Sequence, residues 1–229
     1  MSRQESPFGP ELFRFLDELE ANNRKEWFDA HKSVYEEHVR DAAFQFISEL
    51  GALLRPTSSR FKTIPKISGG SLFRIYRDVR FAKDKRPYKD HVGIHFPHLD
   101  GAGVHAPGFY LHLKPGASFI GVGIHGPDSA AVRQIREHLV EHPGDWTAAT
   151  GKDFQSRFRF DGQSLKRPPK GFAADHPLID DLKRKDFIGI HDFSDEEIQS
   201  AGFVARYHGL CMAGMPLIRF LCRALDLAL

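Results

Sequence analysis

The spacing of hydrophobic and polar positions predicts a helical segment over residues 8–56. Apolar side chains recur every three or four positions from 8 to 21, and again in a longer stripe from 23 to 55. Asn23 is a suitable N-cap for the longer stripe, and Glu26, three residues later, completes a capping-box pattern. We therefore predict two helices, of which the second is long and amphipathic and begins at Asn23.

The chain then changes to short runs that are rich in β-forming residues and alternate in polarity. These runs cover residues 71–77, 91–96, 108–113 and 119–125. Residues 114–117 contain Pro-Gly and predict the turn of a hairpin. In its first strand Leu111 and Leu113 face one way, whereas Tyr110 and His112 face the other.

The last part of the chain mixes helical and strand patterns. The expected elements are a helix over 128–141, a strand over 154–160, a short helix over 177–183, a strand over 186–193 and a helix over 194–227 that kinks at 214–216. Asp128 or Ser129 is the expected cap of the first of these helices. Ser194 and Glu197 form a capping-box pattern, which we expect to open the C-terminal helix.

The order of these elements shows no regular alternation of strands and helices. It favours an α+β fold with a mainly antiparallel sheet, on which an N-terminal helical segment, a middle helix and a long C-terminal helix pack. We expect a single domain over residues 1–229. Its parts would be a helical segment (8–56), a sheet-containing core (71–193) and the C-terminal helix (194–229).

Composition narrows the class of protein. The N-terminus lacks the pattern of a secretory signal, and the chain contains no uninterrupted apolar span of membrane length, so we expect no membrane partner. Cys211 and Cys222 are 11 positions apart in one expected helix, about 16 Å at helical rise, which is too far for a disulfide. Buried thiols of this kind favour a cytoplasmic location.

Charge is concentrated in one stretch. Between Arg74 and Asp90 there are seven cations and three acids, a local excess of four positive charges in a chain whose formal net charge is +2. Arginine and lysine bind phosphate and carboxylate, so we predict an anion site there. The candidate anion ligands are Arg74, Arg77, Arg80, Lys83, Lys85, Tyr88, Lys89, Tyr110 and His112.

Asp78 or His91 would be the general base of such a site. The alternative is a solvated hairpin in which Asp78, Asp84 and Asp90 pair with neighbouring cations and the stretch has only a structural role. We predict neither a metal site nor a cofactor. His91 and His95, for example, would lie about 13 Å apart along a strand, too far to share one ion.

Three segments resemble the signatures of a bacterial and fungal family named domain of unknown function 2461. They are FLDELEANNRKEWFDAHKSVYEEH (15–38), RIYRDVRFAKDKRPYKDHVG (74–93) and YLHLKPGASFIGVGIHGPD (110–128). The resemblance extends over roughly residues 8–225. It implies a single domain of that family, and carries no activity, cofactor or catalytic residue to this chain.

Three functions compete at this stage. The leading interpretation is an enzyme or ligand-binding domain for a small anionic, phosphorylated molecule held in a basic-aromatic pocket. The alternative is a nucleic-acid-binding module, in which Phe73, Tyr76, Phe81 and Tyr88 stack on bases, although the low net charge makes this less favourable. The second alternative is a protein-interaction domain. Whether the chain is an enzyme, and its oligomeric state, stay open.

Overall fold

The computed structural model describes residues 5–101 and 106–229. The chain forms two compact units, each built from three separate segments. The first unit comprises the described residues of Met1–Phe96, together with Tyr110–Ile120 and Asp192–His208. The second comprises the described residues of Pro97–Phe109, together with Gly121–His191 and Gly209–Leu229. That the whole chain forms one domain stays a prediction.

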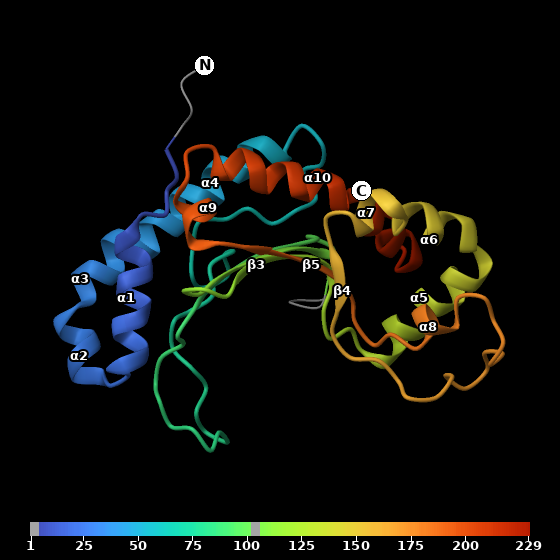
Figure 1. Ribbon diagram of the computed structural model, residues 1–229, viewed down its shortest axis with the longest axis horizontal. Coiled ribbons are helices and arrows are strands. Elements are labelled where there is room, and N and C mark those ends of the chain that lie inside the picture. Colours follow the sequence, from blue (N-terminus) through green and yellow to red (C-terminus); the bar gives the residue numbers. More distant parts are fainter. Residues whose placement is uncertain (1–4, 102–105) are drawn as a thin grey trace. The chain divides into compact units, whose positions relative to one another are not determined.

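The described strands form one five-stranded antiparallel sheet in the order β1-β2-β3-β5-β4 (Figure 1). The strands are β1 (Val92–Pro97), β2 (Gly108–Leu113), β3 (Ser118–Ile124), β4 (Arg159–Asp161) and β5 (Phe187–Phe193). This arrangement confirms the expected α+β class.

The β2–β3 hairpin forms as predicted. Gly116 occupies its turn with φ +64°, a left-handed conformation that favours glycine. Leu111 and Leu113 are fully buried, whereas Tyr110 and His112 on the opposite face are partly exposed. Period-two alternation therefore identified the polar face of β2 from sequence.

The expected long helix from Asn23 is wrong, because the chain breaks at His31. Its place is taken by α2 (Lys25–Ala30), α3 (Lys32–Val34), a π-helical turn η1 (Tyr35–Asp41) and α4 (Ala42–Leu54), which follow the predicted helix α1 (Pro10–Ala21). His31 ends α2 with φ −110° and ψ 14°. Its imidazole stacks on Trp27 at 4.0 Å between ring centroids, and its Nδ1 lies 2.8 Å from the Trp27 carbonyl oxygen. These local contacts favour the break.

Asn23 is not the cap of α2, which begins after Arg24 without a side-chain cap. Instead the Asn23 amide forms a pair of hydrogen bonds with the backbone of Tyr88. Its Oδ1 accepts from the Tyr88 N–H, and its Nδ2 donates to the Tyr88 carbonyl, both at 3.0 Å. A residue with a good capping pattern therefore makes a long-range contact.

Residues 71–77 do not form the expected regular strand. Leu72 pairs with Ile94 of β1, but Tyr76 already pairs with Tyr88. Because the segment changes partner within four residues, no continuous ladder forms. Residues 77–87, which we call the basic loop, extend beyond this second bridge as the long blue-green loop of Figure 1.

In the second unit, Asp128 caps α5 (Ser129–Glu141) as predicted, and its Oδ1 accepts from Ala131 N–H at 2.8 Å. Three further helices follow: α6 (Pro143–Ala149), α7 (Lys152–Gln155) and α8 (Ile179–Leu182). The expected strand over 154–160 is wrong for most of its length. The ring centroids of Phe154 and Phe158 lie 4.9 Å apart across a helical turn, and strand pairing begins only at Arg159.

The predicted capping box of Ser194 and Glu197 is present. It opens the short α9 (Asp195–Gln199), and a turn at Gly202, with φ +85°, separates this from α10 (Phe203–Ala224). The expected continuous C-terminal helix is therefore two helices, and Pro216 lies within the second. Within the described residues, we find no helix with the length and apolarity needed to cross a membrane.

Each unit has an aromatic core. In the first, Phe46 of α4 is fully buried, with its ring centroid 5.2 Å from those of Phe8 and Tyr207. In the second, Trp146 of α6 is 1% exposed and lies 5.2 Å from Phe220 of α10. Both halves of α10 thus contribute large side chains to a core.

Candidate functional site

The basic loop neutralises much of its own charge. Arg80 forms a two-pronged ion pair with Asp78, with Nε–Oδ1 at 2.9 Å and Nη2–Oδ2 at 2.7 Å. The Asp84 carboxylate accepts from Arg77 at 2.8 Å and from Arg86 at 2.9 Å. Here the structural alternative predicted from sequence describes the contacts well.

These pairs also set the chemistry of the loop acids. Hydrogen bonds from Arg80 hold the pKa of Asp78 below its usual value. Backbone and side-chain hydrogen bonds from Arg86, with a further bond from Arg77, lower the pKa of Asp84 to about 2. A lowered pKa makes a carboxylate a weaker base, so the contacts of Asp78 favour a structural role over the predicted catalytic one.

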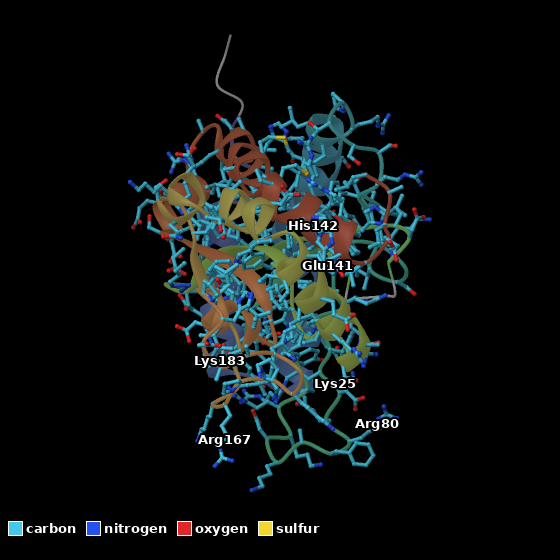
Figure 2. The ribbon with its side chains drawn as sticks, turned by 90° about the vertical axis from the view of Figure 1, so that its right-hand side faces the viewer. Lys25, Arg80, Glu141, His142, Arg167 and Lys183 are labelled. Carbon is cyan, nitrogen blue, oxygen red and sulfur yellow. The ribbon has the colours of Figure 1, made fainter. Side chains whose placement is uncertain are left out.

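The two lysines of the loop do not converge on a pocket either. Lys85 Nζ donates to the carbonyl oxygen of Val79 at 2.9 Å, and Lys83 is exposed. Figure 2 shows the side chains of this loop, among them that of Arg80, projecting outward from the ribbon. The ring of Phe81 is 95% exposed.

Tyr88 fixes the base of the loop. Its ring is 3% exposed and stacks on Phe28 of α2, with 4.3 Å between the centroids. Its backbone is held by Asn23. The surroundings of Tyr88 therefore favour anchoring of the loop over the predicted contact with a ligand.

A different group of side chains lies at the start of β1 and on the polar face of β2. We call Asp90, His91, Tyr110, His112 and Lys114 the histidine cluster. The Asp90 carboxylate bridges two partners, with Oδ1 3.0 Å from His91 Nδ1 and Oδ2 2.5 Å from Lys114 Nζ. The imidazoles of His91 and His112 stack at 4.4 Å, and the Tyr110 hydroxyl lies 3.2 Å from His112 Nδ1.

Burial and neighbouring charges fix the protonation states in this cluster. Burial acts to raise the pKa of Asp90, but hydrogen bonds from Lys114 and His91 outweigh it and hold the pKa well below the usual range. Burial, aided by the charge of His91, lowers the pKa of His112 to about 4. Burial raises the pKa of Tyr110 to about 12. At neutral pH the cluster therefore holds an ionised carboxylate, a neutral imidazole and a protonated phenol.

These states define the hydrogen bonds. A protonated Tyr110 hydroxyl donates to Nδ1 of the neutral His112, which leaves Nε2 of that ring as a donor. In the neutral tautomer in which His91 Nδ1 donates to Asp90, Nε2 of that ring is an acceptor. A carboxylate that orients an imidazole in this way is the arrangement used by histidine bases in enzymes.

Lys89 adjoins the cluster, and the exposed Arg74 lies close enough to Lys89 to influence its charge. The ammonium of Lys89 lies 5.3 Å from the ring centroid of Phe73, which is itself 6.1 Å from the ring of Tyr110. Burial and the positive charge of Arg74 lower the pKa of Lys89. Within residues 5–101 and 106–229, no ion pair joins Lys89 or Arg74 to a carboxylate.

The structure thus separates the predicted site residues into groups. His91, Tyr110 and His112 belong to the histidine cluster, Lys89 lies beside it, and Arg74 lies near Lys89. The others lie on the basic loop or at its base: Arg77, Asp78, Arg80, Lys83, Lys85 and Tyr88. Sequence reasoning treated Lys114 as a turn residue and Asp90 as a surface partner. Period-two spacing from Tyr110 through His112 to Lys114 was the signal that places the lysine on the same face.

The second unit contains a hollow of about 370 Å³. It is lined by His125, Gly126, Pro127, Ser129, Val132, Arg136, Gln163, Leu165, Lys185 and Asp186. Asp186 is buried there and accepts backbone N–H bonds from Gly126 at 2.6 Å and Gln163 at 2.7 Å. None of the predicted anion ligands lines this hollow.

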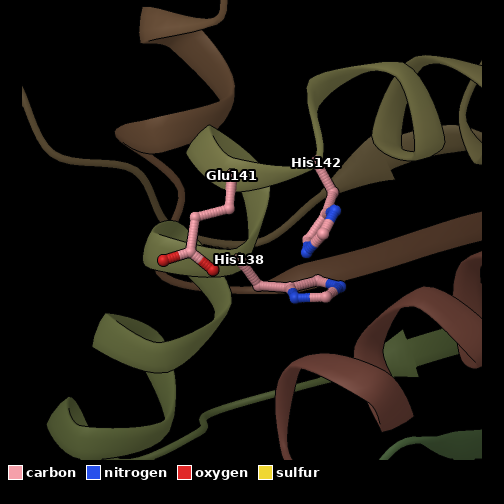
Figure 3. A group of neighbouring side chains, drawn as sticks. All are labelled: His138, Glu141 and His142. Atoms are coloured by element: carbon pink, nitrogen blue, oxygen red, sulfur yellow. The ribbon is translucent and has the colours of Figure 1, made fainter.

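Metal-binding side chains also meet in the second unit. His138, Glu141 and His142 lie at the end of α5, with their candidate ligand atoms all within 4.8 Å of one another (Figure 3). Sequence reasoning examined other histidine pairs and missed this one. The signal was available, because positions i, i+3 and i+4 of the expected helix share one face.

Comparison with known proteins gives one finding. Neither a curated protein nor a solved structure matches the chain. The model of the family described as conserved hypothetical protein (DUF2461) matches residues 11–220. The matched range includes the histidine cluster, the basic loop and the group at the end of α5. The chain therefore belongs to the DUF2461 family.

Proposed function

We propose that the chain binds, and acts on, a small anionic, phosphorylated molecule at the histidine cluster, with Lys89 and Arg74 as the anion ligands. The observation that carries this proposal is the state of these two cations. Lys89 is partly buried, and the neighbouring charge of Arg74 disfavours its charged form. Among the described residues no carboxylate forms an ion pair with either cation, although the exposed Arg74 also helps to lower the pKa of Asp78. A bound phosphate would relieve this repulsion and supply the missing hydrogen-bond acceptors.

The cluster beside these cations supplies groups for acid–base chemistry. In this proposal His91, oriented by Asp90, takes a proton from the substrate or from water through Nε2. His112, whose Nδ1 accepts from the Tyr110 hydroxyl, contributes a hydrogen-bond donor at Nε2 that stays neutral near pH 7, so it can stabilise developing negative charge without titrating. The environment of His91 thus supports the predicted catalytic role better than that of Asp78 does.

Nucleic-acid binding is the second candidate, and one observation favours it. Phe81 is 95% exposed and Tyr76 is 53% exposed, on or beside a loop that also carries exposed Arg80, Lys83 and Lys85. Exposed aromatic rings among cations can stack on unpaired bases. The buried ring of Tyr88 weakens this candidate, because it cannot stack on a base.

We also propose a cytoplasmic location. Cys211 and Cys222 are both free and both buried. Burial raises the pKa of each thiol, that of Cys222 to about 12, so neither is activated for disulfide exchange. Inert thiols of this kind are typical of proteins in reducing compartments.

A thermal-shift panel on the purified chain tests the function. The probes are inorganic phosphate, pyrophosphate, sulfate, sugar phosphates, nucleotides and short single-stranded oligonucleotides, each at low and high salt. The proposal predicts that at least one small phosphate compound raises Tm at both salt concentrations. A rise with oligonucleotides alone, lost at high salt, would support the second candidate instead. No shift with any probe would overturn both.

A further inference from the structure

The last turn of α5 carries three metal-binding side chains in one short stretch, His138-Leu-Val-Glu141-His142. We infer that His138, Glu141 and His142 form a binding site for a divalent transition metal of the zinc type. Two imidazoles and one carboxylate are a donor set that zinc ions favour. This site goes beyond the proposed anion-binding function and depends on none of its residues.

The spacing brings the three groups together without any long-range contact. Residues three and four apart lie on the same face of a helix, one turn above one another. The candidate ligand atoms all lie within 4.8 Å of one another, and Figure 3 shows both rings and the carboxylate turned toward the same space. A metal ion bound about 2.1 Å from each ligand atom would require distances between ligands of about 3 to 4 Å. Small rotations of the side chains are enough to reach this geometry.

The fold holds the ring of His138 and the backbone of His142 in place. The ring of His138 lies 4.9 Å from that of Phe220 of α10 and 4.4 Å from that of His142. His142 joins two helices, since its N–H donates to the His138 carbonyl at 2.8 Å and its own carbonyl accepts from Trp146 N–H at 3.2 Å. The packed side chain of His138 is already in place, so the metal has to order only the exposed side chains of Glu141 and His142, which limits the entropic cost of binding.

A buried polar atom is the second observation that points to this site. His138 Nε2 is buried and has no hydrogen-bond partner among the described residues. Coordination of a metal ion by Nε2 would give this buried nitrogen the polar partner that no described residue supplies.

The nearby charges leave the site with one formal negative charge. Arg223 and Asp145 lie close enough to His138 to influence its titration, and they form an ion pair with each other at 3.0 Å. Glu141 is exposed and forms no ion pair within the described residues. Three protein ligands leave at least one coordination position for water, which is the number found in catalytic rather than structural zinc sites.

Binding of Co²⁺ and Zn²⁺ to the full chain tests the inference. Titration with Co²⁺ should produce visible absorption with one equivalent bound, and Zn²⁺ should displace it. His142→Ala, which removes an exposed side chain and keeps the contact of His138 with Phe220, should weaken Zn²⁺ binding more than about tenfold. Glu141→Gln should weaken it too, with an unchanged thermal midpoint for the metal-free chain.

The matched control is the double variant His31→Gln, His38→Gln, which also removes histidines from helical segments, here seven positions apart. It should bind Zn²⁺ as the wild type does. Two results would overturn the inference: absence of Zn²⁺ binding at micromolar concentration by the wild type, or equal affinity of the wild type and the His142→Ala variant. His138→Ala is a poorer first variant, because loss of its packing against Phe220 can disturb the fold.

Discussion

The basic loop and the histidine cluster are neighbours in sequence, yet they handle charge in opposite ways. In the loop, Asp78 and Asp84 pair with arginines two to seven positions away, at the exposed surface. In the cluster, Asp90 is partly buried and forms hydrogen bonds with Lys114, 24 positions away, and with the imidazole of His91. The loop has the higher density of charge, whereas the cluster holds its carboxylate and imidazoles partly buried.

The difference follows from solvent. Exposed ion pairs are screened by water and salt and contribute little free energy. Partial burial lowers the effective dielectric constant, so the same charges shift pKa values and stabilise one arrangement. A dense run of cations therefore indicates the region of a candidate site, whereas the reactivity of its side chains depends on which of them are withdrawn from solvent.

The largest expected effect is a loss of stability when the base of the basic loop is altered, compared with its tip. Tyr88→Ala removes a buried ring that stacks on Phe28, so we expect a loss of about 3 kcal/mol in the free energy of unfolding. Phe81→Ala at the exposed tip should leave the urea midpoint unchanged. Urea unfolding followed by circular dichroism measures both. Equal losses would show that the tip packs against something in solution.

The next effect compares the two kinds of carboxylate. Asp90→Ala leaves Lys114 and His91 without their shared partner in partly buried surroundings, and should cost about 1 to 3 kcal/mol in unfolding free energy. Asp78→Ala is the matched control, because it breaks only an exposed pair with Arg80, and its urea midpoint should not move. A larger loss in Asp78→Ala than in Asp90→Ala would reverse our comparison.

The third effect, similar in size to that of Asp90→Ala, is a pH dependence due to His112. Its pKa is about 4 in the folded chain and near 6.5 when unfolded, so the unfolded chain binds the proton more tightly. The contribution of the neutral ring is therefore present above pH 6.5 and is lost as the pH falls toward 4. After allowance for solvent screening, we expect a loss of about 1 to 3 kcal/mol across this window.

His112→Gln should remove this component from the curve of unfolding free energy against pH. His125→Gln is the control, since the side chain of His125 is 75% exposed. If His112→Gln leaves the slope between pH 6.5 and 4 unchanged, the imidazole is not held neutral by the fold. Below pH 4, Asp90 contributes separately, because its lowered pKa stabilises the folded chain only while the carboxylate is ionised.

Local patterns predicted much of the fold. Alternation along β2 and β3, the cap at Asp128 and the capping box at Ser194 all depend on residues near one another in sequence. The errors occurred where long-range contacts override local preference. Asn23 has the composition of a cap but bonds to Tyr88, 65 positions away.

In the candidate site, too, the contacts between residues distant in sequence could not be predicted. The position of His112 on a polar face could be predicted, but not its neighbours. Lys114 reaches Asp90 only once the hairpin lies beside β1, and the burial that lowers the pKa of His112 depends on that packing. In contrast, the group of His138 and His142 is local and could have been found from helical spacing alone.

The most direct test asks whether a phosphate compound binds at Lys89 and Arg74, beside the histidine cluster, or at Arg80 of the basic loop. The thermal shift caused by pyrophosphate would be measured for the wild type, Lys89→Ala, Arg74→Ala and, as the control from the basic loop, Arg80→Ala. We predict that the shift is retained in Arg80→Ala and lost in Lys89→Ala and Arg74→Ala while each variant stays folded. A shift that is lost in Arg80→Ala and retained in Lys89→Ala would place the anion on the basic loop and contradict the account.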